Sequence, residues 1–114
     1  MILDKSLFHI SKQDDVLSPF NTRGQCNLQI GKNYKVYCSK GYYDFWTLNS
    51  GGLIKIYNHT ILLLLDKKLV DDQHIFDDAE TDWDFHFLHD GSIITYTAAD
   101  NLVHYQCNFI EVKE

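Results

Sequence analysis

A chain of 114 residues, of which 45% are hydrophobic and 23% charged, is too apolar to be disordered and long enough to bury a core in one domain. The formal net charge of −6 argues against nucleic acid or an anionic membrane as the main partner. Aromatic residues make up 14% of the chain and there is a single proline, a composition that favours sheet. We therefore expect one domain spanning residues 1–114.

The charge is divided unevenly along the chain. Residues 1–68 carry nine Lys and Arg against five acidic residues, whereas residues 69–114 carry one Lys against eleven acidic residues. Lys68 and Lys113 enclose a stretch without any Lys or Arg. A surface built from the second half would repel nucleic acid and attract a cationic partner.

The N-terminus, "MILDKSLFHISKQDD", has neither the basic leader nor the apolar run of a secretory signal. The longest apolar run, residues 61–65, is too short to cross a bilayer. These features predict a soluble, cytoplasmic protein with no membrane partner.

Strand-like patterns fill most of the chain after an ambiguous start. Leu3, Leu7 and Ile10 would align on a short helix, although the same segment could open as a strand, and residues 11–24 have the turn-forming composition of a long loop. Beyond them, apolar and polar residues alternate with period two between short turn sequences. This pattern predicts strands at residues 25–30, 34–38, 42–48, 53–57 and 60–65, with a weaker one at 73–76.

Two features of these strands bear on the core. The apolar side chains at 60–65 are continuous, which fits a strand buried on both faces. Tyr34, Phe45 and Trp46 are aromatic residues in a small domain, and we expect all three in its core.

The last third of the chain has the clearest pattern. "WDFHFLH", "SIITYTA" and "LVHYQCNFIEV" are separated by Asp90–Gly91 and Asp100–Asn101, and they predict a three-strand antiparallel meander. In all, about eight to ten short strands are expected. The predicted fold class is all-β, an antiparallel β-sandwich or an up-and-down barrel, with the possible addition of a short N-terminal helix.

Three cysteines, Cys26, Cys38 and Cys107, are widely spaced and form no CxxC pair. This count favours buried free thiols over a disulfide framework or a zinc knuckle, while a single Cys26–Cys38 bridge stays open.

The stretch "DDAETDWDFHFLHDG", residues 77–91, is the strongest candidate for a functional site. On a strand, Trp83, Phe85 and Phe87 would point into the core, which leaves Asp82, Asp84 and His86 in a row on the solvent face. His86 and His89 are three residues apart, so they would face opposite sides and could not form a compact metal site. Serine-nucleophile motifs, phosphate-binding loops and a second carboxylate across a cleft are not recognisable, so we expect no enzymatic activity and no cofactor.

A small, acidic, single-domain protein with the segment "DDQHIFDDAETDWDFHFLHD" resembles the immunity proteins of bacterial toxin–immunity pairs. The resemblance implies a non-enzymatic module that neutralises a basic, nuclease-like toxin domain through its acidic surface. The expected partner-binding residues are Asp71, Asp72, Asp77, Asp78, Glu80, Asp82, Asp84, His86 and Asp90. Tyr96 and His104 are weaker candidates. The alternative is a β-barrel that binds a small ligand or a metal, with or without catalysis.

Overall fold

The computed structural model describes residues 16–70, 82–100, 102 and 104–113, and these residues form eight β-strands and no helix. All neighbouring strands are antiparallel and belong to one sheet, in the order β1-β8-β2-β5-β6-β7-β3-β4. The predicted all-β fold class is confirmed. The strands are β1 (Val16–Leu17), β2 (Asn33–Cys38), β3 (Tyr42–Thr47), β4 (Leu53–Tyr57), β5 (Ile61–Leu69), β6 (Asp82–His89), β7 (Ser92–Ala99) and β8 (Cys107–Glu111).

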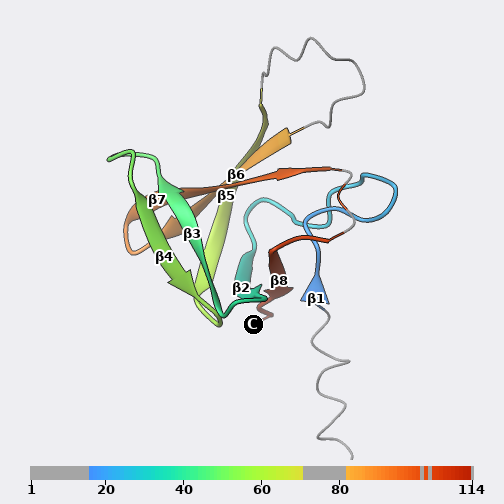
Figure 1. Cartoon of the computed structure of the whole chain (residues 1–114), viewed down its shortest axis with the longest axis horizontal. Helices are drawn as coiled ribbons and strands as arrows, with labels where there is room; N and C mark the ends of the chain where they lie inside the picture. The colour runs from blue at the N-terminus through green and yellow to red at the C-terminus, as the bar shows by residue number, and fades with distance from the viewer. Residues whose placement is uncertain (1–15, 71–81, 101, 103, 114) are drawn as a thin grey trace, which may run out of the picture.

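The sheet curls into a half-barrel, with β3 and β4 on one side and β2, β8 and β1 on the other (Figure 1). The eight strands thus form a single sheet in place of the two facing sheets of a sandwich. Their order also departs from the sequential order of an up-and-down barrel, because β8 lies between β1 and β2.

The inside of the curl is filled by aromatic side chains, several of which meet across strands that are not neighbours. Phe87 of β6 stacks on Phe109 of β8, with ring centroids 5.4 Å apart, and Tyr96 of β7 packs against both Phe109 and Phe45 of β3. Phe45, Phe87 and Phe109 are fully buried. These contacts hold the two sides of the half-barrel together, and each such ring pair contributes about 0.5–1.5 kcal/mol beyond its burial.

A bulge in β5 separates two halves of that strand. Leu64 lies opposite Phe87 and Asp66 lies opposite His86, so Leu65 is an extra residue without a partner on β6. Leu62 and Leu64 are fully buried, whereas Ile61 and Leu65 are exposed. The prediction that residues 60–65 are buried on both faces is therefore wrong, since only alternate side chains enter the core.

The turn between β6 and β7 follows the predicted hairpin geometry. Asp90 and Gly91 have φ angles of 51° and 78°, and His89 pairs with Ser92 on either side of them. Positive φ at both central residues defines the type I′ turn, whose twist matches that of the flanking strands. The Asp-Gly hairpin prediction is confirmed.

The final strand does not continue this hairpin into a meander. β8 pairs with β2 and β1, and β7 instead pairs with β3 on its other side. The predicted three-strand meander is therefore wrong in its third strand. The alternation of the strand is as expected, because Cys107 and Phe109 are buried while Asn108 is half-buried.

The predicted strand at residues 25–30 is also absent from the described sheet. Only an isolated bridge between Phe20 and Cys26 forms there, and the backbone of Asn27 donates to the carbonyl of Pro19. The amide of Gln29 donates to the Tyr34 hydroxyl, so this segment bonds to its own loop and to a side chain of β2 in place of a neighbouring strand. The predicted N-terminal helix and the weak strand at 73–76 lie outside the described residues.

Truncating the aromatic contact across the curl should be costly. We expect Phe109→Ala to lower the free energy of unfolding by about 3–5 kcal/mol, because it removes the ring that Phe87 and Tyr96 pack against. The half-buried neighbour Ile110, on the opposite face of β8, is the matched control, and Ile110→Ala should cost only about 1 kcal/mol. Urea denaturation measures both, and equal losses would contradict this account of the core.

Candidate functional site

The solvent-facing row predicted on β6 exists. Asp82, Asp84 and His86 lie at alternate positions of the strand on the face turned away from the core, which we call the outer face. Same-face neighbours on a strand are about 7 Å apart. We refer to these three residues as the acidic row. All three are half-buried, because the neighbouring strands flank them on both sides.

The other predicted site residues are placed differently. Asp90 occupies the β6–β7 turn, at the end of β6 opposite to Asp82, about 26 Å away at the rise of an extended strand. It is therefore not part of one compact patch with the acidic row. Asp71, Asp72, Asp77, Asp78 and Glu80 lie outside the described residues.

Strands β5 and β7 surround the acidic row with polar partners. Thr97 of β7 lies across from Asp84 and donates a hydrogen bond to its carboxylate. Thr95 lies across from His86, and its hydroxyl is 3.0 Å from the imidazole Nδ1. Both side chains therefore contribute to cross-strand pairing.

A lysine partly neutralises the negative charge of the acidic row. Lys68 of β5 lies directly across from Asp84 on the outer face, next to Asp66, which lies across from His86. Sequence reasoning missed this neighbour because Lys68 stands just before the lysine-free stretch. On the outer face of strands β3 to β7, the charged residues are four aspartates and two lysines, for a net charge of −2 with histidine neutral: Asp44, Asp66, Asp82, Asp84, Lys55 and Lys68.

Next to the acidic row the outer face is apolar. Leu63, Leu88 and Ile93 lie side by side on β5, β6 and β7. Trp46 of β3 lies beside Thr95, and Leu53 of β4 lies beside Trp46. We call these five residues the apolar patch. Trp46 is 53% exposed and Leu53 60% exposed, so the patch presents large side chains to solvent.

The exposure of Trp46 corrects the expectation that it belongs to the core. Tyr34 and Phe45 are buried as predicted, but Trp46 points to the outer face. Its strand alternates, and Trp46 therefore shares a face with Asp44. The charged residue two positions earlier was the sequence signal that this face is the solvent face.

A cavity of about 390 Å³ opens where β3 and β7 part. These strands pair only at Trp46–Thr95 and Thr47–Ile94, and beyond that point Tyr96 to Ala99 line the opening. Asp82, Tyr96 and His104 all line it, so the structure brings both weaker candidates to one end of the acidic row. Burial raises the pKa of the Tyr96 hydroxyl, which therefore stays protonated.

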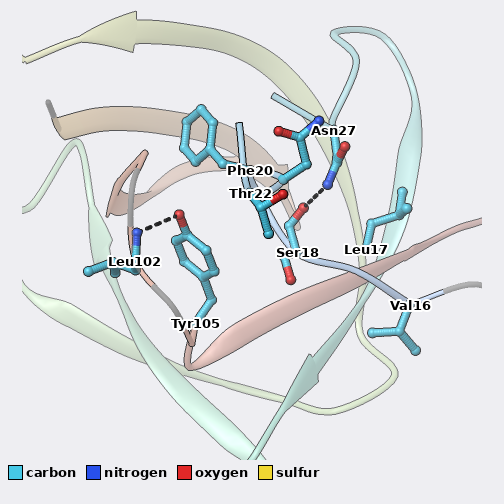
Figure 2. Close-up of a pocket in the computed structure, with 9 residues that line it drawn as sticks. Val16, Leu17, Ser18, Phe20, Thr22, Asn27, Leu102 and Tyr105 are labelled. Atoms are coloured by element: carbon cyan, nitrogen blue, oxygen red, sulfur yellow. Dashed lines mark hydrogen bonds between the residues drawn. The ribbon is translucent and has the colours of Figure 1, made fainter. Parts of the chain in front are cut away.

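A further cavity, of about 540 Å³, lies elsewhere, between the 16–27 segment and Tyr105 (Figure 2). Its lining is uncharged. The Tyr105 hydroxyl donates to the carbonyl of Ala99 and accepts from the amide of Leu102, and the Asn27 side chain donates to the carbonyl of Ser18. These hydrogen bonds fix the walls of the cavity, and none of the predicted site residues lines it.

Two further findings concern the described part of the chain. No three His, Cys, Asp or Glu side chains gather there as a metal ion would require, and His86 and His89 lie on opposite faces of β6 as predicted. No helix among the described residues is long and apolar enough to cross a membrane.

Comparison of the chain with protein-family models, with curated proteins and with solved structures finds no match. The surface of the protein is therefore the basis on which a function can be proposed.

The hydrogen bond between Thr97 and Asp84 should be measurable as a coupling. In a double-mutant cycle of Thr97→Val and Asp84→Ala, we expect a coupling free energy of about 1 kcal/mol in urea unfolding, because a carboxylate acceptor strengthens the bond. Asp82 lies across from Ala99, so the cycle of Asp82→Ala with Thr97→Val should give a coupling near zero. If the two cycles gave the same coupling free energy, the hydrogen bond between Thr97 and Asp84 would not contribute to stability.

Proposed function

We propose that the protein is a non-enzymatic binding module that engages a basic protein through the outer face of its sheet, as an immunity protein acting in the cytoplasm on a basic toxin domain would. The observation that carries this proposal is the position of the acidic row beside the apolar patch on one paired sheet. Carboxylates and exposed large apolar side chains are the two components that a protein interface for a cationic partner requires.

The apolar patch supplies the anchor. Tryptophan is among the residues that contribute most to binding when they are desolvated at the centre of an interface. Trp46 is flanked by Leu53 on β4 and by Thr95 on β7, so a partner side chain that covers it would bury a continuous surface. The strands are held by their ladders, and little conformational entropy is lost on binding.

The carboxylates supply the charge complementarity. Asp66 lies across from His86, next to the apolar patch, and Asp84 and Asp82 follow along β6. A Lys or Arg of the partner could pair with these carboxylates once water is excluded. Their attraction would also accelerate encounter with a basic domain, and salt would weaken that effect. In a nuclease toxin, the same groups would compete for the cationic residues that bind the substrate's phosphates.

The cysteine content is compatible with a reducing compartment. Cys26, Cys38 and Cys107 are all free thiols in the structure, as the spacing predicted. Free thiols persist in the cytoplasm, where small thiols keep them reduced. A cytoplasmic immunity protein would have this state.

The role of charge can be tested with matched reversals. We expect Asp84→Lys to lower the association rate constant for a basic toxin-domain partner by about tenfold at low salt, and Asp82→Lys to act similarly. Glu111→Lys makes the same charge change on β8, on the other side of the half-barrel, and should alter the rate less than twofold. Stopped-flow measurements at two salt concentrations compare the variants, with circular dichroism to confirm folding. Equal effects at Asp84 and Glu111 would contradict a localised site.

The contribution of Trp46 to binding can be tested separately. Trp46→Ala should weaken binding to the same partner by about 2 kcal/mol, or roughly 30-fold in Kd, without a comparable loss of stability, because the side chain is 53% exposed. Val16 is similarly exposed at the opposite edge of the sheet, and Val16→Ala is the control that should leave binding unchanged. Calorimetric titration measures both variants. Unaltered affinity in Trp46→Ala would refute the role of the patch.

A further inference from the structure

Two of the three cysteines face each other across neighbouring strands. Cys38 at the end of β2 and Cys107 at the start of β8 are direct Cα partners, and their Sγ atoms are 3.3 Å apart. Both side chains point to the inner face, where Cys107 is fully buried and Cys38 is 6% exposed. They are 69 residues apart in sequence, and the fold alone brings them together.

The backbone hydrogen bonds around Cys38 show whether Cys38 and Cys107 form a hydrogen-bonded or a non-hydrogen-bonded cross-strand pair. Its amide donates to the side-chain oxygen of Asn58 at 2.7 Å, and its carbonyl accepts from the side-chain nitrogen of Asn58. Two residues earlier, Val36 likewise directs its amide to Thr60 and its carbonyl to His59. The backbone groups of Val36 and Cys38 thus point away from β8.

By contrast, Asn33 directs its carbonyl to Val112, at the β8 side of β2. Hydrogen bonding to β8 therefore falls on the odd-numbered residues of β2, and Cys38 with Cys107 forms a non-hydrogen-bonded pair. In such pairs the Cα atoms are about 4.5 Å apart and the side chains are closest, within the separation that a disulfide bridges.

The surroundings distinguish the two thiols. The hydrogen bond between them lowers the pKa of Cys38 and raises that of Cys107, and burial raises the Cys107 value further. A cavity of about 200 Å³ is lined by Ser39 and Gln106, which adjoin the two cysteines in the chain, and by neither cysteine itself. Cys38 is thus the sulfur with both the better access and the stronger thiolate character.

We propose that Cys38 and Cys107 form a reversible disulfide, a modification site that takes small-molecule disulfides such as glutathione disulfide as its oxidant. This inference is independent of the proposed binding face, because the two sulfurs lie on the inner face of β2 and β8 whereas the acidic row lies on the outer face of β6.

The exchange balances in two steps. The Cys38 thiolate attacks one sulfur of the small disulfide, whose S–S bond breaks, and the first small thiolate leaves with the bonding electron pair. The Cys107 thiol then loses its proton and attacks the Cys38 sulfur, which expels the second small thiolate. Both cysteine protons end on the two released thiols. The protein loses two electrons and the small disulfide gains them.

The bond would tie the end of β2 to the start of β8. β8 is otherwise held by its ladder with β2 and by the two-residue strand β1. A link between residues 69 positions apart restricts the unfolded chain, so the oxidised form should be the more stable one.

The experiment refolds the full chain in glutathione buffers of graded redox poise, so that burial does not limit access to the thiols. In Cys26→Ser, which keeps only the opposed pair, we expect both thiols to be lost together and the protein mass to fall by two hydrogen atoms, with a Cys38–Cys107 peptide after digestion. The thermal midpoint should rise by about 5 °C on oxidation and return on reduction. Cys26 bonds through its Sγ to the carbonyl of Leu28, which makes it the matched site outside the pair.

Several outcomes would overturn the inference. One is folded Cys26→Ser that retains both thiols at the most oxidising poise. Others are stable glutathione adducts at Cys38 without closure, or disulfide-linked dimers in place of the internal bond. Cys38→Ser provides the second variant, which should form no internal disulfide. If Cys38→Ser does not fold, the wild-type chain still tests the proposal. Its oxidation must pair Cys38 with Cys107, and Cys26 must remain a thiol that can be alkylated.

Discussion

The curled shape depends on the aromatic contact between strands that do not pair. Phe87 of β6 and Phe109 of β8 are separated in the sheet by β5 and β2, yet their rings stack at 5.4 Å. An open sheet of eight strands would leave this inner face exposed to water, so burying it requires the sheet to bend upon itself. Because side chains alternate along each strand, every residue that enters this core fixes the outward direction of its neighbours.

The two proposed sites follow from that division of faces. Phe85 and Phe87 point inward, which places Asp84 and His86 outside beside Thr97 and Thr95. The inner face brings Cys38 and Cys107 together, because β8 closes against β2 at the edge of the same core. One face therefore presents charge and an exposed tryptophan to solvent, while the other holds a dithiol.

Local patterns in the sequence predicted the strands better than their partners. Period-two alternation and the Asp90–Gly91 turn identify the β6–β7 hairpin, because both are local properties. The pairing of β8 is not local, since the same alternation would suit either β7 or β2. In the structure β8 begins only at Cys107, so seven residues, 100 to 106, stand where the sequence pattern indicated a two-residue turn at Asp100–Asn101. Of the site, the sequence predicted the acidic row, but the neighbours Lys68 and Trp46 are placed by register across strands.

The central claim is that a basic partner covers the outer face at the apolar patch and the acidic row. Side-chain oxidation footprinting of the chain, alone and with its partner, tests it most directly. We predict that Trp46, Leu53 and Leu88 lose reactivity in the complex while Val16 and Leu102, which are also exposed, keep theirs. Protection of Val16 and Leu102 with Trp46 still reactive would place the interface at the cavity of Figure 2 and contradict the account.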